Sequence, residues 1–240
     1  TRQQLYDAVQ EGFYLVAILS LLLIAVGPLG QVMLTTNLSG RLGSALIQYL
    51  PDTQLILLIG AMVVSLILGM GLPTPVAYII VALALVPFMQ QIGIPALQAH
   101  FFVFYFAVFS TLTPPVAVSV LAAAKLGEAT FLSTAKDSMK IALTTFIIPF
   151  AFVFSPELML FPDITVGTII AIVEVVFVQL AVSVASYGFL FRSLNGVERG
   201  GYTIVALSGF LGFTYDTVFW YVAVILFLAM SGYVYITKKA

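Results

Sequence analysis

The chain has 240 residues, of which 62% are hydrophobic and only 8% are charged, with a formal net charge of −1 and a mean hydropathy of +1.15. A soluble domain carries about 25% charged residues, so this composition excludes a soluble globular protein and indicates a chain whose solvent is lipid. It has no basic run that would indicate nucleic-acid binding. It has no Cys, which excludes disulfides, thiolate metal sites and a Cys nucleophile.

The apolar stretches are long and continuous, so they predict helices rather than the short alternating strands of a membrane barrel. No Asp, Glu, Lys or Arg occurs from Thr53 to Ala124. The polar stretch 38–50 predicts a short helix lying at the membrane interface. The predicted fold is an all-α polytopic membrane protein, whose apolar segments are 12–36, 53–91, 96–126, 140–155, 165–191 and 202–237.

The distribution of Lys and Arg predicts an orientation, because cytoplasmic loops favour basic residues. Lys125, Lys136 and Lys140 place the loop 125–140 on the cytoplasmic side. Arg192 and Arg199 do the same for 192–200, whereas the intervening stretch 156–163 carries only acidic charges and is expected outside.

Two apolar segments are interrupted by helix-breaking residues. Segment 53–91 is broken at 69–75, and each arm of some sixteen residues would be about 24 Å long, slightly short of a full crossing. A re-entrant hairpin with its tip near mid-membrane fits these lengths. Segment 96–126 is broken at 110–115, which predicts a discontinuous transmembrane helix. Within hydrocarbon such breaks are tolerated only where protein or a water-filled cavity covers the freed backbone groups.

Paired mid-membrane breaks are typical of secondary transporters. Unwound carbonyls coordinate a cation such as Na⁺, and exposed helix N-termini attract an anionic substrate. The alternative interpretation is a pair of structural proline kinks. We therefore predict an ion- and substrate-binding site, with Na⁺ held through the same two loops, formed by Gly69, Met70, Gly71, Pro73, Thr74, Pro75, Ser110, Thr111, Thr113, Pro114 and Pro115.

Three stretches resemble the large membrane subunit of TRAP transporters, the tripartite ATP-independent periplasmic transporters. They are "GMGLPTPVAYII", "GIPALQAHFFVFYFAVFSTLTPPVAVSVLAAA" and "IALTTFIIPFAFVFSPELML". The resemblance covers about residues 1–160, is closest to the fused permeases that work with TAXI-type binding proteins, and rests most on "AHFFVFYFAVFSTLTPP". The tail, with "YGFLFRSLNGVERGGY", is similar to the end of those permeases with low specificity.

The resemblance implies a Na⁺-coupled elevator transporter in a bacterial or archaeal cytoplasmic membrane. Its substrates would be organic anions, mostly carboxylates, delivered by a periplasmic substrate-binding protein. Residues 1–160 would be the second inverted repeat and 161–240 additional C-terminal transmembrane helices. The chain begins at Thr1 and corresponds to a C-terminal half, so the first repeat and the small membrane subunit, fused or separate, are expected partners beside the lipid bilayer.

Two other classes of function were weighed. An intramembrane transferase would need His100 or Glu174 in a cavity, but these lie on separate segments and no catalytic constellation accompanies them, so no enzyme and no cofactor beyond the coupling ion is expected. A membrane scaffold without transport would make the breaks purely structural. Asp216 is expected to cap the last helix.

Overall fold

The structure, a computed structural model, describes residues 2–51, 53–159 and 164–237. These residues are almost entirely helical, and the only strands among them are β1 (Phe189–Leu190) and β2 (Arg192–Ser193), which pair as a short antiparallel hairpin. Four stretches in the described ranges are long and apolar enough to cross a membrane: Thr74–Gln91, Phe131–Phe154, Val166–Tyr187 and Thr217–Ile236. The chain is therefore an all-α polytopic membrane protein, as predicted.

The described residues form two compact units. Residues 1–96 and 103–111 belong to the first unit, and residues 97–102 and 112–240 to the second. The helices in chain order are α1 (Arg2–Thr35), α2 (Leu38–Tyr49), α3 (Gln54–Gly69), α4 (Thr74–Gln91), α5 (Ala96–Phe109), α6 (Val118–Leu126), α7 (Phe131–Thr145), α8 (Ile147–Phe154), the 3₁₀ turn η1 (Pro156–Met159), α9 (Val166–Tyr187), α10 (Gly196–Thr214) and α11 (Thr217–Ile236).

Helix α4 is the centre of the first unit and packs against α1, α2 and α3. It is hydrophobic around its whole circumference, which is typical of a helix covered on several sides. Gly43 of α2 makes one of these approaches possible, because a Cβ there would lie 2.7 Å from the ring of Phe88. On another side of α4, the rings of Tyr78 and Phe104 meet edge to face with their centroids 5.6 Å apart.

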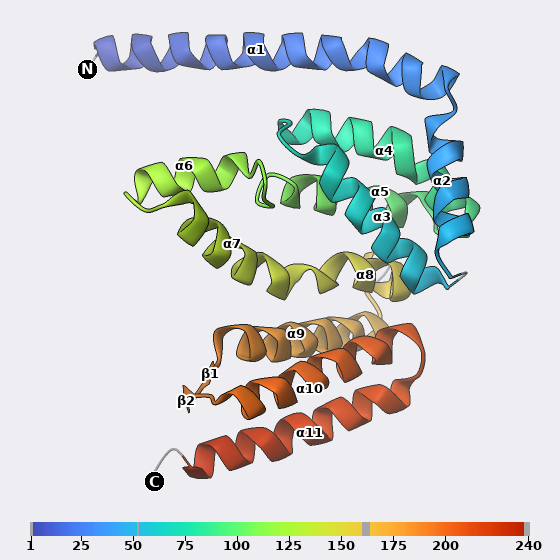
Figure 1. The fold of residues 1–240 in the computed structure, drawn as a ribbon, viewed down its shortest axis with the longest axis vertical. Helices are drawn as coiled ribbons and strands as arrows, with labels where there is room; N and C mark the ends of the chain where they lie inside the picture. The colour runs from blue at the N-terminus through green and yellow to red at the C-terminus, as the bar shows by residue number, and fades with distance from the viewer. Residues whose placement is uncertain (1, 52, 160–163, 238–240) are drawn as a thin grey trace. The chain divides into compact units, whose positions relative to one another are not determined.

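Both predicted interruptions are present. Helix α3 ends at Gly69 and α4 begins at Thr74, and α5 ends at Phe109 while α6 begins at Val118. The first pair of helices folds back as a hairpin (Figure 1). Helix α4 is itself long and apolar enough to cross a membrane, so the placement of this hairpin as a re-entrant element stays a prediction.

The span expected at 140–155 begins earlier, at Phe131, because α7 and α8 follow each other almost without interruption. Thr130 caps α7 by accepting a hydrogen bond from the Ser133 N–H at 3.4 Å. The prediction of a loop over 125–140 was therefore wrong beyond residue 130. The polar residues that suggested a loop form the exposed face of an amphipathic helix, which carries Lys136 and Lys140.

Helices α9, α10 and α11 form a bundle in the second unit with α10 in the middle (Figure 1). The sequence also predicts a break near Gly209 to Asp216, and the chain is interrupted at the end of that range, because α10 ends at Thr214 and α11 begins at Thr217. Gly209 itself lies within α10. The glycines of this helix are points of close packing. A Cβ on Gly209 would lie 2.7 Å from Val178 of α9, and a Cβ on Gly212 would lie 3.0–3.2 Å from Trp220 of α11.

Polar contacts fix the ends of this bundle. Asp216 accepts a hydrogen bond from the Val218 N–H at 2.9 Å and caps α11, as predicted. At the opposite end, Arg192 donates to the Glu198 carboxylate at 2.5 and 3.0 Å. The Asn195 N–H donates to the same carboxylate at 2.9 Å. These donors, Arg192 first, hold the pKa of Glu198 below its usual range.

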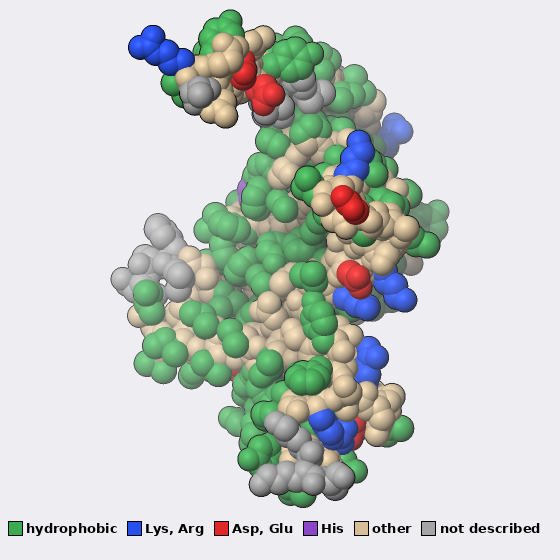
Figure 2. Space-filling model, turned by 90° about the vertical axis from the view of Figure 1, so that its left-hand side faces the viewer, with side chains coloured by type: hydrophobic (Ala, Val, Ile, Leu, Met, Phe, Trp, Pro, Cys, Tyr) green, Lys and Arg blue, Asp and Glu red, His purple; other side chains and the backbone are tan. Residues whose placement is uncertain are grey.

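Much of the surface is apolar, as expected for a protein in lipid. Hydrophobic side chains cover most of the face seen in Figure 2, and the few charged side chains lie in small groups. Helix α11 illustrates the pattern, because only 11% of its apolar window is buried. Its large side chains therefore face outward, toward where lipid or another transmembrane segment would lie.

Candidate ion-binding junction

The tip of the α3–α4 hairpin is a tight connection over Met70 to Pro73. The Leu72 N–H donates to the Gly69 carbonyl at 3.3 Å, which closes a turn directly after α3. Gly71 in this turn has a φ of +74°, in the left-handed region that side-chain-bearing residues disfavour. The glycine predicted as part of the site is thus required by the backbone of the tip itself.

The start of α4 has few backbone donors. Pro73 is the N-cap residue and Pro75 is the second helical residue, and neither has an N–H. The donors of this first turn are therefore the Thr74 and Val76 N–H groups, because the Ala77 N–H already donates to the Pro73 carbonyl at 2.9 Å. The partial positive charge of the helix N-terminus is concentrated at these two groups.

The end of α5 carries two hydroxyls that hydrogen-bond within their own helix. Ser110 Oγ donates to the Ala107 carbonyl at 2.6 Å, and Thr111 Oγ1 donates to the Val108 carbonyl at 2.8 Å. A hydroxyl has one proton. Once that proton is donated, the oxygen offers only lone pairs to any other group, which suits a cation ligand.

Gly69 and Ser110 lie against each other within the first unit. A Cβ on Gly69 would overlap Ser110 Oγ and lie 2.8 Å from Ser110 Cβ. Both residues are buried. Each lies at the C-terminal end of its helix, so the carbonyl ends of α3 and α5 converge here. Each such end carries roughly −0.5 elementary charge, so the partial charges at this contact would favour a cation over an anion. We call the contact between Gly69 and Ser110 the α3–α5 junction.

The remaining predicted residues belong to the second unit. Thr113 is buried, whereas Pro114 and Pro115 are exposed and joined by a cis peptide bond. The junction thus contains Gly69, Ser110 and the adjoining tip residues. The structure does not bring Thr113, Pro114 and Pro115 into the same unit as the tip.

Ala117 is a feature of the second break that the sequence reasoning missed. It is the N-cap residue of α6, has a φ of +41° and is fully buried. A residue with a Cβ disfavours this conformation by about 1–2 kcal/mol. Ala117 packs with Val120 of α6 and with Ala135 of α7, and this packing holds Ala117 in its left-handed conformation. No sequence signal marks an alanine for a left-handed conformation.

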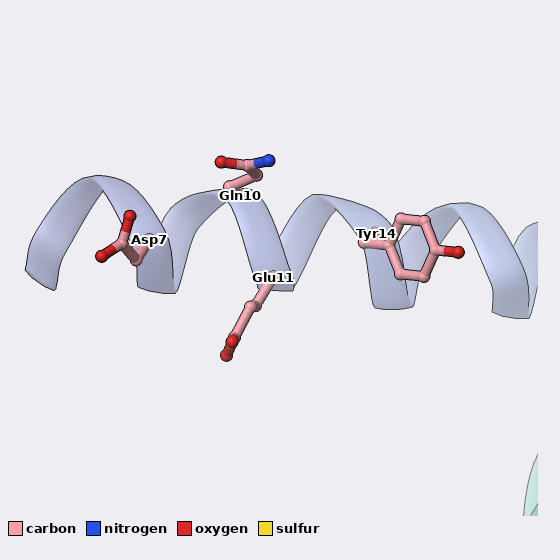
Figure 3. Close-up of a pocket in the computed structure, with 4 residues that line it drawn as sticks. All are labelled: Asp7, Gln10, Glu11 and Tyr14. Carbon is pink, nitrogen blue, oxygen red and sulfur yellow. The ribbon is translucent and has the colours of Figure 1, made fainter.

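The ionisable residues weighed in the sequence do not gather into a site. Among the described residues, no group of three or more His, Cys, Asp or Glu could hold a metal. His100 lies on α5 and Glu174 on α9, both partly buried. Figure 3 shows a surface hollow with two carboxylates on the exposed first turns of α1, where the side chains point in different directions. Its lining residues are Asp7, Gln10, Glu11 and Tyr14.

Comparison with known families decides the class of the protein. Residues 1–166 match the family described as the tripartite ATP-independent periplasmic transporter, DctM component. The chain belongs to the DctM family. This DctM chain is therefore a membrane component of a TRAP transporter, and its family is one of transporters rather than enzymes.

The DctM match includes both interruptions and ends at Val166, the first residue of α9. The α9–α11 bundle thus lies beyond the matched residues. No curated protein and no solved structure matches the chain. The expected resemblance over residues 1–160 is confirmed by the DctM match.

Proposed function

We propose that this DctM chain supplies the second repeat of a Na⁺-coupled TRAP permease. The transporter would import organic anions, mostly carboxylates, that a periplasmic substrate-binding protein delivers to a bacterial or archaeal cytoplasmic membrane. The first repeat and the small membrane subunit would complete the assembly. The observation that carries the proposal is the α3–α5 junction, in a chain whose family transports solutes.

The junction supports a cation by three independent features. Two helix C-termini point their partial negative charge at one place. Two hydroxyls there, those of Ser110 and Thr111, have already donated their protons inside α5. The backbone of the tip turns at Gly71, which ends the α3 helix and leaves the Gly69 carbonyl, which accepts from the Leu72 N–H, with a second lone pair. Oxygen ligands of this kind suit a hard cation.

Substrate binding is assigned to the opposite helix ends. The Thr74 and Val76 N–H groups at the start of α4, with the hydroxyl of Thr74, can donate to a carboxylate. In this proposal the cation and the anion bind at the two ends of broken helices, so each stabilises the other through their opposite charges.

The transport domain is proposed to move as an elevator against a scaffold, with the hairpin re-entering the membrane. The hairpin α3–α4 and the broken helix α5–α6 would belong to the moving part. The α9–α11 bundle, outside the family match, would belong to the fixed part. Closing the hairpin tip over substrate and ion would then permit movement only when both are bound.

The test is uptake by the complete permease reconstituted in proteoliposomes with its binding protein and a labelled carboxylate. A Na⁺ gradient should drive uptake, and replacing Na⁺ by choline should abolish it. Ser110→Ala should raise the Na⁺ concentration for half-maximal uptake about tenfold, since one ligand to a charge is worth about 1.5 kcal/mol or more.

Ser133→Ala is the matched control, because Ser133 is exposed on α7. It should leave the Na⁺ dependence unchanged. Equal uptake with and without Na⁺ would overturn the coupling proposal. An unchanged Na⁺ dependence in Ser110→Ala would remove the α3–α5 junction from it.

A further inference from the structure

The end of α1, the start of α2 and the end of α4 meet in the first unit (Figure 1). A hollow outside the proposed transport site is lined by residues of these three segments. Its volume is about 250 Å³. The hydrophobic lining side chains come from α1 and α4, and the polar ones are those of Asn37, Ser39 and Gln91. The lining residues are Met33, Leu34, Asn37, Ser39, Gly40, Leu83, Pro87, Phe88 and Gln91.

A buried hydroxyl without a hydrogen-bond partner belongs to one of the residues that line the hollow. In the described part of the chain, Ser39 Oγ is the one buried side-chain nitrogen or oxygen without a hydrogen-bond partner. Leaving such a group unpaired is costly, so an unpaired hydroxyl at the wall of a hollow needs an explanation. A hydroxyl on one rotatable bond can turn toward a ligand without any movement of the helix.

The start of α2 offers further donors at the same place. Asn37 is the N-cap residue, has a φ of +49° and makes no side-chain hydrogen bond to the helix. Its amide lies over the first turn, since a Cβ on Gly40 would be 2.6 Å from both terminal atoms of Asn37. The first N–H groups of α2 therefore have no cap, and they carry the positive end of the helix dipole.

The chemistry of the walls specifies the ligand. None of the nine lining residues is charged, so no carboxylate repels an anion. Arg41, exposed in the first turn of α2, is the one basic residue of that helix. An anion at a helix N-terminus, held beside an apolar wall in a membrane protein, matches the junction between the phosphate and the acyl chains of a lipid.

We propose that this hollow is a phospholipid site. The phosphodiester would accept hydrogen bonds from Ser39 Oγ and from the first turn of α2, and the start of an acyl chain would lie against Leu83 and Pro87. A lipid held here would bridge α1, α2 and α4, which would tie the polar helix α2 to the membrane surface.

The experiment measures the thermal unfolding of the full-length protein, purified in detergent and delipidated, with added phosphatidylglycerol. A ligand that binds only the folded state raises the melting temperature as its concentration rises. Wild type should show a saturable rise. Ser39→Ala should melt no lower than wild type without lipid, because it removes the unpaired hydroxyl, but should need about tenfold more phosphatidylglycerol for the same rise.

Two further variants separate binding from folding. Asn37→Gly keeps the left-handed backbone at the N-cap and removes the amide, so it should also weaken the response. Ser44→Ala changes an exposed serine of the same helix and should respond as wild type does.

Three outcomes would overturn the proposal. One is an equal phosphatidylglycerol response in wild type and Ser39→Ala. A second is an equal response to diacylglycerol, which has the acyl chains without the phosphate. The third is an equal rise with inorganic phosphate alone, which would make the hollow a site for small anions instead.

Discussion

Gly69→Ala adds a single methyl group at the α3–α5 junction, where the structure leaves no room for it. The new Cβ would overlap Ser110 Oγ and lie 2.8 Å from Ser110 Cβ. Real carbon atoms need at least about 3.5 Å, so one helix end must shift by several tenths of an ångström. Because both residues are buried in packed surroundings, we expect the shift to be resisted.

The cost follows from the overpacking of buried sites, which typically amounts to about 1–3 kcal/mol. Replacing a helical glycine by alanine returns up to about 1 kcal/mol. The difference between these two terms spans about 0–3 kcal/mol, and we take its middle, about 1–2 kcal/mol, as the expected net destabilisation. For a chain of this size, that corresponds to a fall in melting temperature of about 2–8 °C.

The assay is thermal unfolding of the purified protein, with Ser110→Gly as a second variant. Ser110→Gly alone loses a hydrogen bond and should also destabilise by about 1 kcal/mol. In the double variant, Ser110→Gly removes the side chain that the new Cβ of Gly69→Ala would otherwise overlap. The double variant should therefore be at least about 1 kcal/mol more stable than the sum of the two single effects predicts.

Gly232→Ala is the matched control, because this glycine of α11 has nothing within 4 Å of an added Cβ. It should keep or raise the melting temperature. Additive effects at positions 69 and 110, or a Gly69→Ala variant as stable as wild type, would refute the close approach of the two helix ends.

Three other predictions concern the tip and the α9–α11 bundle. Gly71→Ala should destabilise the protein by about 1–2 kcal/mol, because alanine disfavours the φ of +74° at this position, and it should raise the Na⁺ concentration that uptake requires. Gly12→Ala in α1 should change neither quantity, because an added Cβ at Gly12 would have nothing within 4 Å. Gly209→Val should lower the melting temperature by more than Gly200→Val does, because a side chain at Gly209 would meet Val178 and one at Gly200 would meet nothing within 4 Å. Equal effects would contradict the close packing of α10 on α9. Because the pKa of Glu198 is lower in the folded protein than in the unfolded chain, its carboxylate stabilises the folded state. This contribution is fully present above about pH 4.3, the ordinary pKa of Glu, and is lost as the pH falls through the lower pKa of the folded state. Melting temperature measured between pH 3 and 6 should show this loss in wild type but not in Glu198→Gln, with Glu11→Gln on the exposed start of α1 behaving as wild type.

The helix breaks could be predicted from the sequence because their cause is local. Proline removes a donor wherever it lies, and the pair Pro73 and Pro75 allows little besides a helix start. The meeting of Gly69 with Ser110 could not be predicted from local preference, since it depends on packing between residues 41 positions apart in the chain. The sequence identified both residues, but their contact is a property of the tertiary structure.

The errors came from residues with two physical roles. Glycine both breaks helices and lets them approach closely, so the break predicted near Gly209 to Asp216 began too early: it lies after Thr214, and Gly209 is a packing contact. Lys136 and Lys140 could belong to a loop or to the exposed side of a helix, and the structure places them on α7. In both cases neighbouring helices, which no local pattern reveals, decide the role.

The close packing of α10 makes the α9–α11 bundle sensitive to the exact length of that helix. Gly201 of α10 is a further packing point, because a Cβ there would overlap the Met230 side chain of α11. One residue inserted between Gly201 and Gly209 would rotate everything after it by about 100°. Gly209 would then turn away from Val178, and a bulkier residue would take its place. Natural relatives should therefore vary in the length of the connections around α10 while keeping the number of residues between these glycines fixed.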